Sequence, residues 1–210
     1  MKTIKLNRRQ FLKGTGAIVG FGLFPWLISP VAGQSLVDDR GEGTANHNYF
    51  AANQTEDLKL LLGHVQNNHL KPCPHSPGGI YEDIAKGRYD YAKGDIIFIL
   101  ERFVNHPTAL QLMTPVARAS KQSGWPIERF EYALKWYPNY AITHAQYGWY
   151  LVESDNVPAG IQKLETAVKM DPKLIACYVW LSKAYVKQGN SEAARQAADK
   201  ARELGYKGQL

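Results

Sequence analysis

The feature that most constrains this chain is an internal repeat of 34 residues near its C-terminal end. Shifting the first copy by that length brings small residues onto small ones and helix positions onto helix positions: Gly148 on Ser182, Leu164 on Ala198 and Ala167 on Ala201. A repeat of this length holds two helices, which approach closely only where the facing side chains are small. One helix pair cannot bury its apolar face alone, so pairs must stack. The repeat therefore predicts an all-α solenoid of antiparallel helix pairs.

The same pattern resembles the tetratricopeptide repeat (TPR). The second copy carries it as Tyr178-x-x-Leu181-Ser182, followed by Gly189, Ala194 and Ala201 at the usual intervals. Residues 140–206 resemble TPR repeats outright, and about 79–139 resemble diverged ones. The segment 94–110 is also similar to one found in exported bacterial TPR proteins. The resemblance implies a TPR-like α-solenoid that binds peptides or protein segments along a concave groove lined by the first helix of each pair.

The chain before the repeats divides by composition. The predicted parts are a signal peptide (1–33), a flexible lead-in with one helix and a Pro/Gly loop (34–78), a repeat-like hairpin with a degenerate TPR (79–139), and two TPR repeats with a C-terminal cap (140–210). The helix in the lead-in is expected over 53–70, where Asn53 and Glu56 have capping-box spacing. Further helices are expected over 80–86, 89–105, 108–120 and 127–137, and Pro107 can begin the third of these.

The N-terminus reads as an export signal. A basic start, an apolar Gly-rich stretch and small residues near Gly33 are typical of a signal peptide. The leader resembles a bacterial twin-arginine (Tat) signal through Arg8, Arg9, Phe11, Leu12 and Lys13. This resemblance implies a folded protein exported to the periplasm, with no stable membrane anchor after cleavage. The alternative is a retained transmembrane anchor, although three glycines and a proline interrupt the apolar run.

The net charge does not indicate a nucleic-acid partner. The chain carries a formal charge of +6, but five of its 25 basic residues lie in the first 13 positions. Without the leader, 20 basic residues face 19 acidic ones. Such a nearly neutral chain produces no long-range field for a phosphate backbone. We therefore expect no nucleic-acid partner, and the TPR resemblance implies a protein or peptide partner instead.

Candidate partner contacts follow from placing the TPR groove on this repeat frame. The groove positions are Gln111, Arg118, Trp149, Val152, Lys183 and Lys187. The Lys/Asn set with which some TPR domains bind a C-terminal carboxylate is not matched. A mixed aromatic and basic surface can still hold an acidic or amphipathic segment. The alternatives are that Trp149 is ordinary interhelix packing and that the two lysines, one helical turn apart, form a solvated face.

A possible metal site lies in the lead-in. His69, Cys73 and His75 offer nitrogen and sulfur donors suited to zinc or copper. The spacing matches no strong rule, however, and Pro74 extends the chain and separates the donors. The alternative is a polar loop with scattered histidines. A disulfide between Cys73 and Cys177 is not expected, because an extended solenoid keeps them apart, and Cys177 is expected to be a small core residue.

No catalytic motif is present. The chain has no haem-attachment motif, no Gly-rich dinucleotide motif and no Ser-centred nucleophile elbow. We therefore expect no enzyme activity and assign no cofactor. The preferred function is a periplasmic TPR adaptor or scaffold. The alternatives are a metal-handling (Cu/Zn) periplasmic protein and a structural subunit of an exported complex. The identity of the partner and the oligomeric state stay open.

Overall fold

A computed structural model describes residues 46–72 and 78–210 of the chain. Its elements, in chain order, are η1 (Tyr49–Ala51), α2 (Glu56–Val65), the π-helical turn η2 (Gln66–Leu70), α3 (Gly79–Ala85), α4 (Tyr89–Arg102), α5 (Pro107–Ser120), α6 (Trp125–Trp136), α7 (Ala141–Glu153), α8 (Val157–Met170), α9 (Ile175–Gln188) and α10 (Ser191–Glu203). Apart from an isolated bridge between His47 and Phe103, these described residues form no β-structure. The predicted all-α class is confirmed.

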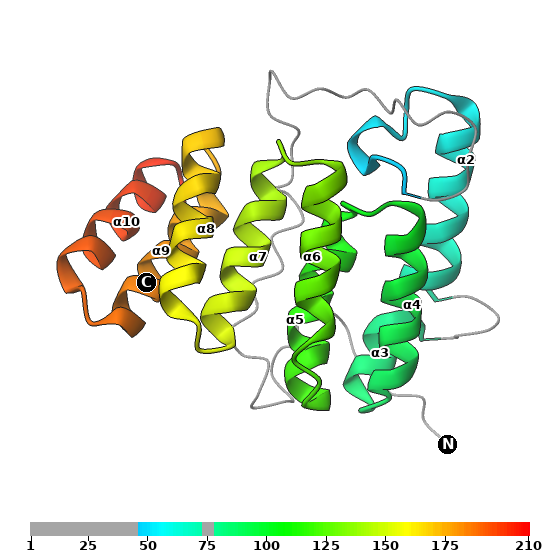
Figure 1. Cartoon of the computed structure of the whole chain (residues 1–210), viewed down its shortest axis with the longest axis horizontal. Coiled ribbons are helices and arrows are strands. Elements are labelled where there is room, and N and C mark those ends of the chain that lie inside the picture. The colour runs from blue at the N-terminus through cyan, green and yellow to red at the C-terminus, as the bar shows by residue number, and fades with distance from the viewer. Residues whose placement is uncertain (1–45, 73–77) are drawn as a thin grey trace.

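The helices are arranged as a row of antiparallel pairs that crosses the molecule in chain order (Figure 1). Within pairs, α3 packs on α4, α5 on α6, α7 on α8, and α9 on α10. The first helices of successive pairs also touch, α5 against α7 and α7 against α9. Each pair therefore contacts mainly its neighbours, as in a repeat array. This arrangement is the predicted TPR-like α-solenoid.

Helix α7 contributes side chains to both of the two largest hydrophobic cores. Its Tyr150 and Leu151 belong to the core formed with α3 to α6, whereas Trp149 and Val152 belong to the core formed with α8 to α10. Most α7 side chains are consequently buried. The small residues predicted to allow close helix packing are also buried: Gly148, Ser182, Ala194 and Ala201. Apolar burial on both sides of one helix links the diverged repeats to the clear ones.

His47 and Asn48, inside the predicted lead-in (34–78), are packed against the array and so depart from the flexibility expected there. His47 and Asn48 are fully buried. Asn48 Oδ1 accepts a hydrogen bond from Asn105 Nδ2 at 2.9 Å, and Asn48 Nδ2 donates to the Tyr140 hydroxyl at 2.6 Å. Asn105 Oδ1 accepts from the backbone N–H of Tyr49 at 2.7 Å. These buried amides are ordered because each finds polar partners away from water.

The first helix differs from its predicted bounds. Thr55, not Asn53, is the N-cap: its hydroxyl accepts from the backbone N–H of Leu58 at 3.2 Å, and α2 begins at Glu56. After Val65 the helix widens into η2, in which the N–H of Lys71 reaches the carbonyl of Gln66. The expected single helix over 53–70 is therefore shorter at its start and changes type near its end. The reason is local, because Thr55 is the residue whose extended backbone supports a cap.

Two other helix boundaries have clear causes. Pro107 begins α5, as predicted, and His106 Nδ1 caps that helix by accepting from the N–H of Ala109. Helix α4 ends at Arg102 rather than at residue 105, because Phe103 leaves the helical conformation and pairs with His47. Within the described ranges, no helix has both the length and the apolar content that crossing a membrane requires.

Candidate interaction surface

The candidate surface lies on the first helices α5, α7 and α9, which stand next to each other. Because the pairs repeat at 34 residues, equivalent positions recur on neighbouring helices. Arg118 lies in the last turn of α5, Glu153 at the end of α7, and Lys187 in the last turn of α9. Three charged side chains from three successive repeats therefore meet at one end of the surface.

These three side chains form a connected ion-pair cluster. Arg118 Nη1 is hydrogen-bonded to Glu153 Oε2. Lys187 Nζ lies 3.7 Å from Glu153 Oε1 and donates a hydrogen bond to the Val152 carbonyl at 3.0 Å. The Glu153 side chain is only 12% exposed, whereas those of Arg118 and Lys187 are 49% and 40% exposed. The carboxylate is thus enclosed by two cations that remain open to solvent.

An aromatic pair lies on the same helices, nearer their middle. The rings of Trp149 and Trp180 are stacked, with centroids 6.0 Å apart and planes 12° apart. Lys183 Nζ lies 5.9 Å from the centre of the Trp149 ring, in cation–π range. Trp149 is 8% exposed. It therefore packs between helices, as the alternative interpretation held, and it also supports the ammonium group of Lys183.

The other two predicted contact residues occupy different environments. Gln111 is half-buried on α5. Val152 is fully buried and belongs to the core between α7 and α10. Only the carbonyl group of Val152 takes part in the charged cluster, through Lys187. The structure thus gathers Arg118, Trp149, Lys183 and Lys187 into one region and assigns the Val152 side chain to packing.

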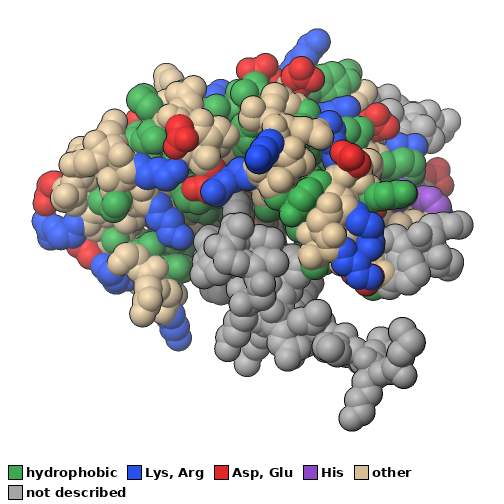
Figure 2. Space-filling view, turned by 90° about the horizontal axis from the view of Figure 1, so that it is seen from below, with side chains coloured by type: hydrophobic (Ala, Val, Ile, Leu, Met, Phe, Trp, Pro, Cys, Tyr) green, Lys and Arg blue, Asp and Glu red, His purple; other side chains and the backbone are tan. Residues whose placement is uncertain are grey.

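Glu153, like Trp180, is a residue of this surface that the sequence interpretation did not single out. A signal for it was present, because Glu153 and Lys187 are 34 residues apart and occupy equivalent positions with opposite charge. Figure 2 shows basic side chains interspersed with acidic and hydrophobic ones over the face that it presents. A surface of mixed charge suits a protein segment better than a phosphate backbone.

Of the three predicted metal ligands, His69 is the one that lies among the described residues. His69 Nδ1 lies 2.8 Å from Asp95 Oδ1, and its ring stacks on Phe98 with centroids 3.9 Å apart. Burial raises the pKa of Asp95, and the hydrogen bond to His69 offsets part of that rise. Cys73 and His75 lie outside the described residues, as do the leader residues Arg8, Arg9, Phe11, Leu12 and Lys13. Within 46–72 and 78–210, no three His, Cys, Asp or Glu residues are grouped to hold a metal ion.

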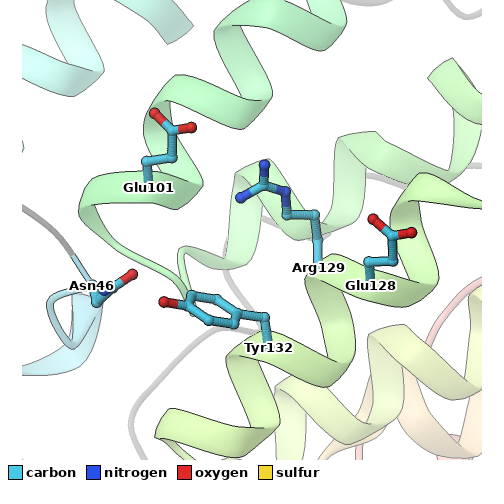
Figure 3. A pocket seen from close by; sticks show the side chains of 5 residues that line it. All are labelled: Asn46, Glu101, Glu128, Arg129 and Tyr132. Carbon is cyan, nitrogen blue, oxygen red and sulfur yellow. The ribbon is translucent and has the colours of Figure 1, made fainter.

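A second surface feature is an open hollow between α4 and α6 (Figure 3). It has a volume of about 280 Å³ and is lined by Asn46, Glu101, Glu128, Arg129 and Tyr132. Tyr132 and the neighbouring Trp136 are partly exposed and meet edge to face, with centroids 6.2 Å apart. Two carboxylates and a guanidinium line the same small space, so the hollow does not favour a ligand of either charge.

No protein-family model and no curated protein sequence matches the chain. The solved structures that are similar to it include the following two. One is MamA, residues 41 to the end, from Desulfovibrio magneticus RS-1, with 22% identity and a TM-score of 0.46 over 70% of this chain and 84% of that one. The other is a MamA RS-1 ArsTM double mutant, with 22% identity and a TM-score of 0.45 over 71% and 84% of the two chains. Both likenesses are too distant to indicate what this chain binds.

Proposed function

We propose that this protein is a non-enzymatic scaffold that binds a segment of another protein across the first helices α5, α7 and α9. The observation that carries the proposal is the alignment of an aromatic pair and three cations over three successive repeats: Arg118, Trp149, Trp180, Lys183 and Lys187. The cations are the part of this alignment that reaches solvent, and Arg is one of the residue types that dominate binding energy at protein interfaces. The two tryptophans are buried, and Trp149 supports Lys183 from within the helix layer. Lysines beside them favour a partner segment with acidic and apolar side chains.

The compartment that we propose is the periplasm. The support is the leader, whose paired arginines Arg8 and Arg9 precede Phe11, Leu12 and Lys13 as in twin-arginine signals. Replacing Arg8 and Arg9 by lysine should leave the protein in the cytoplasmic fraction, while the parent chain is found in the periplasmic fraction. Periplasmic recovery of the Lys-Lys variant would contradict a twin-arginine route.

The binding proposal is tested by affinity capture with the full chain carrying a C-terminal tag, exported in cells and recovered from a periplasmic extract. The informative variant is Lys183→Glu, because Lys183 packs on the Trp149 ring and forms no ion pair with another of the residues that the structure describes. The matched control is Lys135→Glu on α6, an exposed lysine on a second helix. We expect a partner that the parent and the control retain and that Lys183→Glu loses.

The affinity of the captured partner should fall by about tenfold or more in Lys183→Glu, which corresponds to about 1.4 kcal/mol of binding free energy. Circular dichroism of each variant establishes that the helices are intact. If Lys183→Glu and the parent retained every partner equally, this surface would not be the binding site.

A further inference from the structure

The ion-pair cluster on the candidate surface contains a carboxylate that the chain itself supplies. Glu153 is the last residue of α7, where the helix dipole presents its negative end. A carboxylate at that position is unfavourable unless cations compensate it. Arg118 from α5 and Lys187 from α9 provide this compensation from both sides. The two cations, on different repeats, form a seat suited to one carboxylate.

The two cations of the seat are accessible to solvent, whereas the Glu153 carboxylate between them is not. The side chains of Arg118 and Lys187 are about half exposed, whereas Glu153 is largely enclosed between them. Asp155 lies 3.9 Å from Lys187 Nζ but is 95% exposed, so it does not fill the seat. The seat lies beyond Trp149 and Lys183 toward the C-terminal ends of the helices. A segment crossing the aromatic pair would therefore reach it with a nearby side chain.

We propose that Glu153 is an internal ligand of this seat, and that a partner segment binds through an acidic side chain that replaces Glu153 between Arg118 and Lys187. The inference rests on the proposed binding function, because it assigns the partner its chemistry at the same surface. Displacement exchanges one carboxylate for another, so the two cations stay paired, while the released Glu153 side chain turns out into water from the end of α7. Glu153 then sets specificity: a neutral segment cannot displace it.

The seat is tested directly by titrating the full chain with sodium acetate at constant ionic strength, with chloride as the replaced anion. The readout is the NMR shift of the Arg118 side chain and of the backbone N–H of Ser154. In Glu153→Gln and Glu153→Ala we expect saturable shifts, with a half-saturating concentration at least about tenfold below that of the parent, because the freed cations regain a carboxylate. Asp155→Asn is the matched control, since it removes the same charge two residues away, and it should behave as the parent.

The acetate titration can contradict the proposal in two ways. Absence of saturable shifts in both Glu153 variants overturns the seat, and equal saturation in the parent overturns its occupation by Glu153. Thermal unfolding of the same samples shows whether the variants remain folded. The capture experiment depends on Lys183 and not on Glu153. A negative acetate titration therefore leaves the proposed binding function intact, and a negative capture result is seen independently of the titration.

The source of the carboxylate is tested with two otherwise identical peptides. One has a central glutamate and blocked ends; the other has a central glutamine and a free C-terminal carboxylate. Glu153→Gln should bind the first peptide more tightly than the second, and the parent should bind the first more weakly than the variant does. If Glu153→Gln preferred the second peptide, the seat would bind a chain terminus rather than an acidic side chain. If it bound neither peptide, the proposal that an acidic side chain occupies the seat would also be wrong.

Discussion

Gly148 and Gly160 approach each other so closely that neither position can carry a side chain without movement of the backbone. A Cβ on Gly148 would lie 2.8 Å from the Gly160 carbonyl oxygen and 2.8 Å from Leu164 Cγ. A Cβ on Gly160 would lie 2.7 Å from the Gly148 oxygen. The 34-residue repeat places Ser182 and Ala194 at the equivalent positions of the next pair. The α7–α8 contact is therefore the closer version of a repeated packing arrangement.

The first prediction concerns this contact. Gly148→Ala and Gly160→Ala should each lower the free energy of unfolding by about 1–3 kcal/mol, because an overpacked core forces its helices apart. Urea denaturation measures the change. Gly94→Ala is the matched control: Gly94 is helical, and a Cβ there meets nothing within 4 Å. It should raise stability by about 0.5–1 kcal/mol. Equal stability of Gly148→Ala and Gly94→Ala would contradict the close approach.

The second prediction concerns acid. His106 is fully buried beside Tyr49, and burial lowers its pKa to about 3. Burial also lowers the pKa of His144. A folded-state pKa below the unfolded value of about 6.5 means that the stabilisation is complete above pH 6.5 and is lost as pH falls toward 3. The contribution of His106 to this loss is at most about 1.4 kcal/mol per pH unit.

The variant that isolates His106 is His106→Asn. Asparagine is a good N-cap and does not titrate, so the start of α5 keeps a side-chain acceptor. Urea denaturation from pH 7 to pH 4 should show a shallower decline of stability than in the parent, whatever the absolute value at pH 7. Parallel declines in the two proteins would show that His106 is protonated in the folded state without cost.

The third prediction separates two lysines that look equivalent in sequence. Lys187 binds the Val152 carbonyl and neighbours Glu153, so Lys187→Met should lower the free energy of unfolding by roughly 1 kcal/mol. Within the described part of the chain, Lys183→Met loses the contact with the Trp149 ring, and it should cost about 0.5 kcal/mol or less. Combining Lys187→Met with Glu153→Gln in a double-mutant cycle measures the ion pair itself. A larger loss for Lys183→Met than for Lys187→Met would reverse this assignment.

The fourth prediction concerns the thiol in the C-terminal core. Cys177 is free and fully buried, its Sγ donates to the Leu164 carbonyl at 3.1 Å, and burial raises the pKa of the thiol. The thiolate is the reactive form, so this cysteine should be inert in the folded protein. In a Cys73→Ser background, a thiol reagent should label Cys177 only at urea concentrations that unfold α7 to α10. Rapid labelling in native buffer would place the thiol at the surface.

Much of the fold could be predicted because its signals are local. The repeat frame located the small residues, and Pro107 marked the start of α5. The buried linkage of Asn48 to Tyr140 had no such signal, since the two residues are 92 positions apart and polar residues usually indicate exposure. Likewise, spacing placed Lys183 and Lys187 on one face, but only the packing of three helices showed that Glu153 engages one of them.

The buried linkage between Asn48 and Tyr140 also bears on the order of folding. Contacts between neighbouring helix pairs join nearby residues and form fast, whereas a contact over 92 residues carries a larger loop-closure cost. We therefore expect the segment 46–52 to complete its docking late, although the ribosome makes it before the helices on which it packs. Before Tyr140 has been synthesised, Asn48 can bind Asn105 but lacks its second buried partner, so the array reaches its final state only after most of the chain has been synthesised.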